Sequence, residues 1–270
     1  MFLAYCQHLD CHASIVPHSP VGCFGSGTDT MEDMRNPRPL PQGKQPSGVQ
    51  VLWMIFGIVT AIFYFTRRVL VSLHAGGWAT DLDAPAYQWV LNNQSPALFA
   101  VSDFLYFWGS TPGMSIIMVL ITGLLSWKTR SIWPFIAVAL TAAVSVGLTI
   151  LLKASLQVHR PEGIPGGPTP PLSYSFPSGH TLNSAALIGI SGYLAIIYGL
   201  RRYAYLIAIV ATLFVLAMGA SRIYIGHHWV SDVLVGLLIG TAWAAVVAIL
   251  HYFFVPWRRV ASSARGSVNR

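Results

Sequence analysis

The chain contains a series of long apolar runs, and this feature limits its fold more than any other. The runs are separated by short polar segments and lie at residues 51–73, 112–127, 132–152, 180–199, 203–220 and 233–254. A helix rises about 1.5 Å per residue, so a run of about 20 residues crosses a hydrocarbon layer of about 30 Å. We therefore expect an all-α polytopic membrane protein with six transmembrane helices.

The composition agrees with a chain that faces lipid rather than water. Of its 270 residues, 54% are hydrophobic and 9% are charged, whereas a soluble domain carries about 25% charged residues. The net charge of +7 fits the excess of Lys and Arg in the cytoplasmic loops of membrane proteins. No basic run interrupts the apolar segments, so we expect no nucleic-acid partner.

Three regions follow from this pattern. Residues 1–50 are polar and rich in Pro and Gly, so we expect a disordered tail. Residues 51–257 form the membrane domain, and residues 258–270 a basic cytoplasmic tail. Within the domain, the aromatic-rich segment 97–108 is short for a span and carries Asp103, which favours an interfacial or re-entrant helix. All three cysteines lie in the polar tail, in a pattern typical neither of a disulfide framework nor of a zinc site.

The charges also predict an orientation. If the N-terminus is cytoplasmic and six helices cross the membrane, most of the 16 Lys and Arg residues lie on the cytoplasmic side. Helix parity then places three polar segments on the same outer face: Lys153–Pro161, Pro177–His180 and Ser221–Asp232. We expect an integral protein of a bacterial cytoplasmic membrane whose site faces outside.

Cations dominate these polar segments. Lys153, Arg160 and Arg222 bring three positive charges to one surface with few matching acids, which suits a phosphate. Lys153 and Arg160 are seven residues apart and share a helix face if the helix continues between them. Ser178 and Gly179 precede a helix, whose first N–H groups also bind anions.

The same segments contain an acid–base set. His228 lies four residues before Asp232, so one helical turn lets the carboxylate hold one ring nitrogen and leaves the other as a nucleophile. His180 is then placed to protonate a leaving alkoxide. Phosphatases with two metals need several carboxylates, and only Asp232 and Glu162 lie near these segments. We therefore expect no metal and no cofactor.

Together the motifs resemble one known family. Lys-x6-Arg-Pro begins at Lys153, Pro-Ser-Gly-His at Pro177, and Ser-Arg-x5-His-x3-Asp at Ser221. All three are complete and in the order found in the type 2 phosphatidic acid phosphatase (PAP2) superfamily. The resemblance covers about residues 50–255, and the segment from Asp83 to Ser110 also looks like the loop before the second helix of bacterial members.

The resemblance implies a six-helix membrane bundle and a role for each motif residue. The phosphoryl oxygens would be bound by Lys153, Arg160, Ser178, Gly179 and Arg222. His228 would attack phosphorus to form a phosphohistidine, and Asp232 would orient it. His180 would act as general acid and would then activate water.

These expectations describe a metal-independent phosphatase acting on a lipid phosphate or lipid diphosphate at the extracytoplasmic face. Substrate candidates are undecaprenyl diphosphate, phosphatidylglycerol phosphate and phosphatidic acid, and the oligomeric state stays open. A phosphotransferase with the same intermediate and a non-catalytic lipid-phosphate transporter or flippase are alternatives. We expect His227 to be structural and residues 163–176 to be a connector rather than a lid, while Tyr224 fits either a site wall or an interfacial position.

Overall fold

The protein is all-helical over the residues that its computed structural model describes, 47–254, apart from turns and loops. The helices are α2 (Gly48–His74), α3 (Trp78–Asn92), α4 (Pro96–Gly109), α5 (Thr111–Thr129), α6 (Trp133–Leu156), α7 (Gly179–Ala195), α8 (Ala204–Tyr224) and α9 (Val230–Phe254). Two short helices, η1 (Ile196–Leu200) and η2 (Arg201–Tyr203), join α7 to α8. The predicted fold class is confirmed. The cysteines, most of the polar tail and the basic tail lie outside the described residues.

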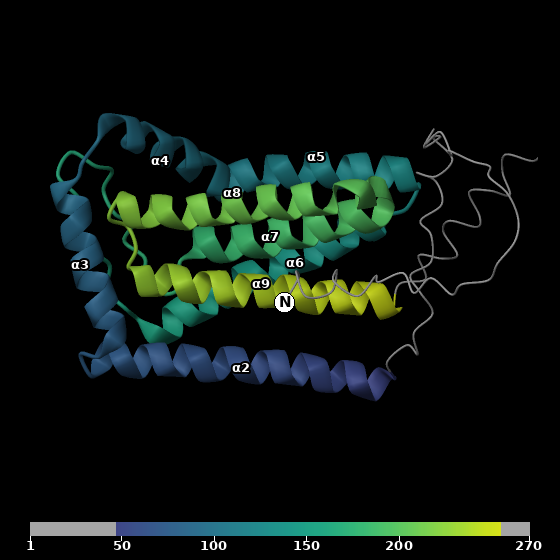
Figure 1. Ribbon diagram of the computed structural model, residues 1–270, viewed down its shortest axis with the longest axis horizontal. Coiled ribbons are helices and arrows are strands. Elements are labelled where there is room, and N and C mark those ends of the chain that lie inside the picture. The colour runs from purple at the N-terminus through teal and green to yellow at the C-terminus, as the bar shows by residue number, and fades with distance from the viewer. Residues whose placement is uncertain (1–46, 255–270) are drawn as a thin grey trace, which may run out of the picture.

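Most of the long helices run side by side along the longest axis of the molecule. In Figure 1, α2 and α5 to α9 follow this axis, while α3 crosses one end of the bundle. Helix α7 lies in the middle and packs against α6, α8 and α9. Two glycines bring α9 close to α7: a Cβ at Gly236 would lie 3.0 Å from Ser178 O, and one at Gly240 would collide with Leu182 O. This close approach places the start of α7 beside the start of α9.

Five helical stretches among residues 47–254 are long and apolar enough to cross a membrane. Four of them are α2, α5, α6 and α9, and the fifth, Gly179–Tyr224, contains both α7 and α8. This stretch folds back at η1, where Gly199 adopts a φ of 133°, so that α7 and α8 pack together. The polytopic fold is thus confirmed, and the number of six crossings stays a prediction.

Two elements differ from the sequence expectation. None of the expected helices covers the polar stretch 76–96, yet most of it forms α3, with Pro85 inside the helix. Helix α3 is held by tertiary contacts, because Ser72 Oγ accepts a hydrogen bond from Ala79 N at 2.9 Å and Asp83 is buried. Helix α2 begins before residue 51, at Gly48, after a capping box between Ser47 and Gln50. The short helix expected at 97–108 is present as α4.

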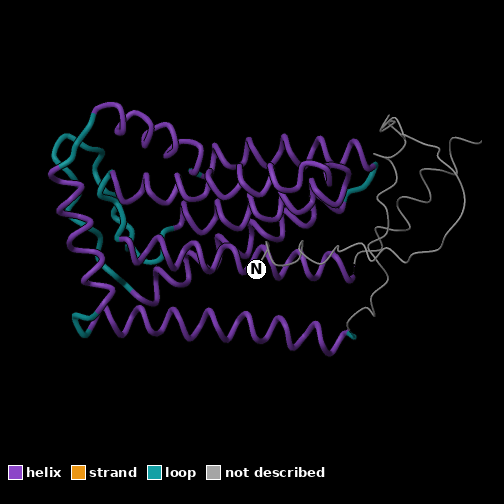
Figure 2. The backbone as a smooth tube through the Cα atoms, in the orientation of Figure 1, coloured by secondary structure: helices purple, strands orange, loops and turns teal. Residues whose placement is uncertain are grey.

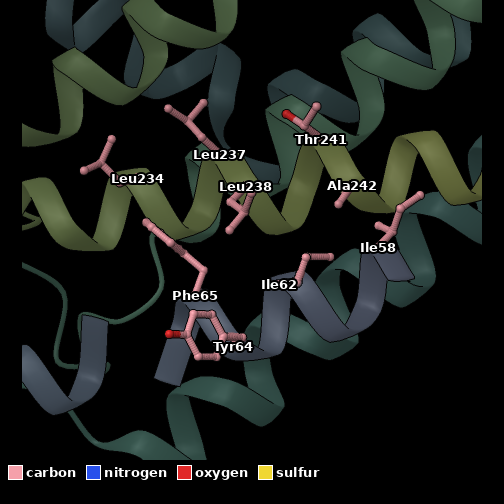
Figure 3. A pocket seen from close by; sticks show the side chains of 10 residues that line it. Ile58, Ile62, Tyr64, Phe65, Leu234, Leu237, Leu238, Thr241 and Ala242 are labelled. Atoms are coloured by element: carbon pink, nitrogen blue, oxygen red, sulfur yellow. The ribbon is translucent and has the colours of Figure 1, made fainter. Parts of the chain in front are cut away.

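An apolar groove of about 760 Å³ lies between α2 and α9. Figure 3 shows side chains of both helices that line it, among them Phe65 and Leu238. The only polar side chains in its lining are Tyr64 and Thr241, so the groove holds neither an acid nor a base. The residues with acid–base chemistry lie elsewhere, at the end of the bundle.

Candidate active site

The three polar motifs meet at the end of the bundle that α3 crosses. The end of α6, the start of α7, the end of α8 and the start of α9 all reach this end (Figure 1). Figure 2 shows that most of the described loops gather here too. Convergence on one face was predicted from helix parity, and the structure brings the segments together.

His228 and Asp232 form a buried pair. His228 lies two residues before α9, and its Nδ1 donates to Oδ2 of Asp232, in the first turn of that helix, at 3.1 Å. The two residues are 5% and 0% exposed. Trp229 N donates to the same oxygen at 2.9 Å. Burial lowers the pKa of His228 well below its ordinary value, and nearby Arg160 and Lys153 lower it further. The imidazole is therefore neutral, with a proton on Nδ1 and a lone pair on Nε2.

Ser175 contacts both residues of this pair, although no motif in the sequence indicates it. Its hydroxyl donates to Asp232 Oδ2 and lies 3.4 Å from His228 Nδ1. The main chain adds a further link, because Ser178 N donates to Asp232 O at 3.2 Å. The start of α7 is thereby tied to the start of α9. Ser175 lies outside the motifs, and its contact spans 57 residues of sequence.

The helix does not continue from Lys153 to Arg160, so the condition for a shared helix face is not met. Helix α6 ends at Leu156, where Gln157 takes a left-handed conformation with φ of 51°. The two cations instead converge on the main chain of one loop. Lys153 Nζ donates to Ser175 O at 2.9 Å, and Arg160 Nε donates to Ser173 O at 2.7 Å.

Arg160 also contacts the proposed nucleophile. Its Nη1 lies 3.0 Å from His228 Nε2, the nitrogen that carries the lone pair. Burial lowers the pKa of Arg160, while Asp232 and the Tyr106 phenol raise it. The guanidinium therefore stays charged and lies against the Nε2 lone pair of His228.

Arg222 reaches the site from α8. It is 1% exposed, and it donates from Nε to Ser221 Oγ at 3.1 Å and from Nη2 to Ser102 O at 3.0 Å. Its Nη1 has no hydrogen-bond partner among the described residues, and neither has the buried Nε2 of His180. Buried polar atoms ordinarily have partners. Both atoms are thus free to bind an oxygen of a ligand.

Ser178 and Gly179 form the start of α7. Ser178 is fully buried, and its Oγ accepts a hydrogen bond from Thr181 Oγ1 at 3.0 Å, which leaves its own proton free to donate. Gly179 packs against α6, where a Cβ would lie 3.0 Å from Thr149 Cγ2. The Gly179 amide lies in the first turn, where helical N–H groups lack intrahelical partners.

The connecting loop 163–176 is fastened over this end of the bundle. His227 Nε2 donates to Pro168 O at 3.0 Å, and Tyr87 donates to Gly163 O at 2.5 Å. Burial lowers the pKa of His227, although the hydrogen bond to the Pro168 carbonyl opposes this shift. The neutral ring therefore holds the loop in place, which is the kind of structural role that we expected for His227. Tyr224 is also a tether, because its hydroxyl accepts from Ser95 N at 2.7 Å.

Asp83 is a further buried residue that supports the site. It accepts hydrogen bonds from Ser231 N at 2.9 Å and Ser231 Oγ at 2.6 Å, which fixes α3 to the start of α9. Burial raises the pKa of Asp83, although these hydrogen bonds oppose the shift. Within residues 47–254, no group of three or more His, Cys, Asp or Glu side chains is arranged to hold a metal ion.

Comparison with known proteins finds a similarity to one family. The family model of the PAP2 superfamily matches residues 133–256, which include all three motifs. Over this segment, the chain is similar to the PAP2 superfamily. It is 24% identical over 182 residues to phosphatidylglycerophosphatase B of Bacillus subtilis strain 168, a match that covers 67% of this chain and 88% of that protein.

Two further relatives point to the same family. Undecaprenyl-diphosphatase of Sulfolobus acidocaldarius is 23% identical over 196 residues, with 71% of this chain and 88% of that protein covered. The crystal structure of a transmembrane PAP2-type phosphatidylglycerolphosphate phosphatase from Bacillus subtilis has a TM-score of 0.66 at 22% identity, covering 73% of this chain and 97% of that one. The predicted family, the class of enzyme (a phosphatase) and the helical membrane fold are confirmed.

Proposed function

We propose that this protein hydrolyses a lipid phosphate or lipid diphosphate without a metal, through a phosphohistidine, at the extracytoplasmic face of the membrane. The main support is the buried His228–Asp232 pair, whose Nε2 lone pair meets the guanidinium of Arg160. The free Nη1 of Arg222 and Nε2 of His180 supply a further anion donor and an acid–base group. A site that only bound or transported a lipid phosphate would need no oriented nucleophile.

In the first step, the phosphoryl group binds among the cations. Arg160 turns its Nη1 from His228 Nε2 to a phosphoryl oxygen, and Lys153, Arg222, Ser178 and the Gly179 amide bind the remaining oxygens. His228 Nε2 attacks phosphorus, so an N–P bond forms while the P–O bond to the lipid breaks. His180, protonated at this stage, gives its proton to the leaving oxygen.

In the second step, His180 acts as a base. It takes a proton from water as the water oxygen attacks phosphorus, and the N–P bond returns its electrons to His228. Inorganic phosphate leaves. Asp232 stays ionised and stabilises the positive charge that His228 carries while it is phosphorylated.

The substrate class follows from the relatives and from the place of the site. The two relatives named above are a phosphatidylglycerophosphatase and an undecaprenyl-diphosphatase. The site lies at the end of an apolar bundle, where a membrane lipid presents its headgroup. We therefore propose a lipid monophosphate or diphosphate as substrate, with residues 51–257 as the functional domain.

Purified protein should release phosphate from at least one of phosphatidylglycerol phosphate, phosphatidic acid and undecaprenyl diphosphate, with EDTA present. His228→Ala should abolish release, and Thr169→Ala, in the exposed part of the connecting loop, should not change it. Restoration by magnesium of activity lost to EDTA would contradict the metal-free mechanism. Transfer of a labelled phosphoryl group to a second lipid instead of water would contradict hydrolysis.

A further inference from the structure

Tyr106 of α4 contacts several groups of the site at once. Its ring is stacked on the ring of His180, with centroids 5.1 Å apart and planes 23° apart. The guanidinium carbon of Arg222 lies over the same ring, 4.8 Å from the centroid. The ring of His227 meets it nearly edge-on at 6.2 Å.

Helix α4 reaches the site independently of the three motifs. It precedes the segment that the family model matches, residues 133–256. It is fixed to α8 where Arg222 donates to Ser102 O, one helical turn before Tyr106. Tyr106 is 37% exposed, so one part of its ring faces the surroundings while another contacts buried groups. The Tyr106 ring therefore lies between the site and the exterior of the protein.

The orientation of the His180 ring depends on its contact with the Tyr106 ring. Its Nε2 is buried without a hydrogen-bond partner among the described residues, so no bond at this atom fixes the ring plane. The stacked ring of Tyr106 restricts that plane. An aromatic face also attracts a cation, so the same ring favours His180 while it carries the proton for the leaving group.

We propose that Tyr106 is a positioning residue, which holds His180 in the geometry needed to expel the lipid oxygen. This inference rests on the proposed function, in which His180 is the general acid. The aromatic face carries the effect, and the phenolic hydroxyl does not. Tyr106 thus acts through His180 rather than on the phosphoryl group directly.

The leaving group distinguishes this role from a merely structural one. A lipid alkoxide needs a proton when it departs, whereas the p-nitrophenolate of p-nitrophenyl phosphate leaves without one. We expect Tyr106→Leu to lower kcat/KM for phosphatidic acid about 3- to 30-fold, the size of a lost stacking and cation–π contact. For p-nitrophenyl phosphate we expect a change of less than about twofold.

Further variants isolate the ring. Tyr106→Phe keeps the face and should retain activity on both substrates. In a His180→Ala background, Tyr106→Leu should have no further effect on phosphatidic acid, because the residue through which it acts is gone. Phe107→Leu, at an exposed neighbouring position of α4, is the matched control and should leave both rates unchanged.

Three outcomes would overturn the proposal: equal losses on both substrates, loss with Tyr106→Phe, or a full additional loss in the His180→Ala background. The proposed function is tested separately by His228→Ala in the same assay. Phosphate release by that variant would refute the phosphohistidine mechanism whatever Tyr106 does. If His228→Ala is inactive and Tyr106→Leu affects both substrates equally, only the role of Tyr106 fails.

Discussion

At the residue scale, the site depends on how the buried carboxylate of Asp232 is held. Its Oδ2 accepts hydrogen bonds from His228 Nδ1, Trp229 N and Ser175 Oγ. Motif spacing predicted His228 and Asp232, because their contact lies within one helical turn. It could not predict Ser175, Tyr106 or Asp83, since each reaches the site from a distant part of the chain.

Ser175→Ala should lower kcat. The substitution removes one donor from a buried carboxylate, a loss of about 1–3 kcal/mol, which corresponds to about 5- to 150-fold if it is expressed in the transition state. Initial rates of phosphate release measure it, with Thr169→Ala as the control. A rate within twofold of the wild type would show that Ser175 does not support Asp232 in catalysis.

The pH dependence should report on His228. The nucleophile must be unprotonated, and because burial together with Arg160 and Lys153 lowers its pKa well below 6.5, the acid limb of kcat/KM should lie below pH 6.5. Arg160→Gln removes a positive charge, which raises the pKa of His228. Protonation then begins at higher pH, so the acid limb should move to higher pH in a pH series of kcat/KM. A limb that stays in place or moves to lower pH contradicts this assignment.

At the element scale, the site is assembled by helix ends that meet. Polar motifs at the termini of α6, α7, α8 and α9 were recognisable in the sequence, and so were the long apolar helices. The end of α6 at Leu156 was not recognisable in the sequence, because the left-handed turn at Gln157 contains neither Gly nor Pro. Helix α3 was also missed, since Gly76, Gly77 and Pro85 read as a loop, whereas buried Asp83 and the Ser72 hydroxyl hold it as a helix.

The close contact between α7 and α9 should be sensitive to added volume. Gly240→Ala places a Cβ against Leu182 O and should destabilise the fold by about 1–3 kcal/mol. We also expect a loss of activity, because the added Cβ pushes α9 away from Ser178. Thermal unfolding and phosphate release measure the two effects. Gly147→Ala in α6 is the control, because a Cβ there meets nothing within 4 Å. Equal behaviour of the two variants would refute the tight-packing account.

At the scale of the whole molecule, the bundle separates the site from the opposite end of the long helices. The start of α2 and the end of α9 lie at the same end of the bundle, away from α3 and the site (Figure 1). A cytoplasmic N-terminus would therefore place the site outside, as the distribution of Lys and Arg predicts. Helix parity was enough to predict that the three polar segments meet at one end, but not how the loops hold them.

This orientation is tested by labelling in intact cells. In a background with Cys6, Cys11 and Cys23 replaced by Ser, Thr169→Cys in the connecting loop should react with a membrane-impermeant maleimide. Ser131→Cys, in the α5–α6 turn at the opposite end, should react only after the cells are opened. The reverse pattern would place the site in the cytoplasm.

The central claim is a covalent phosphohistidine at His228, and trapping that intermediate tests it most directly. In His180→Ala, ³²P-labelled p-nitrophenyl phosphate should still phosphorylate the enzyme, because its leaving group needs no acid, while hydrolysis lacks its base. Quenched samples should therefore contain an acid-labile, alkali-stable label on the peptide that holds His228, and none when His228→Ala is added. Absence of label despite turnover, or label on another residue, would contradict the mechanism.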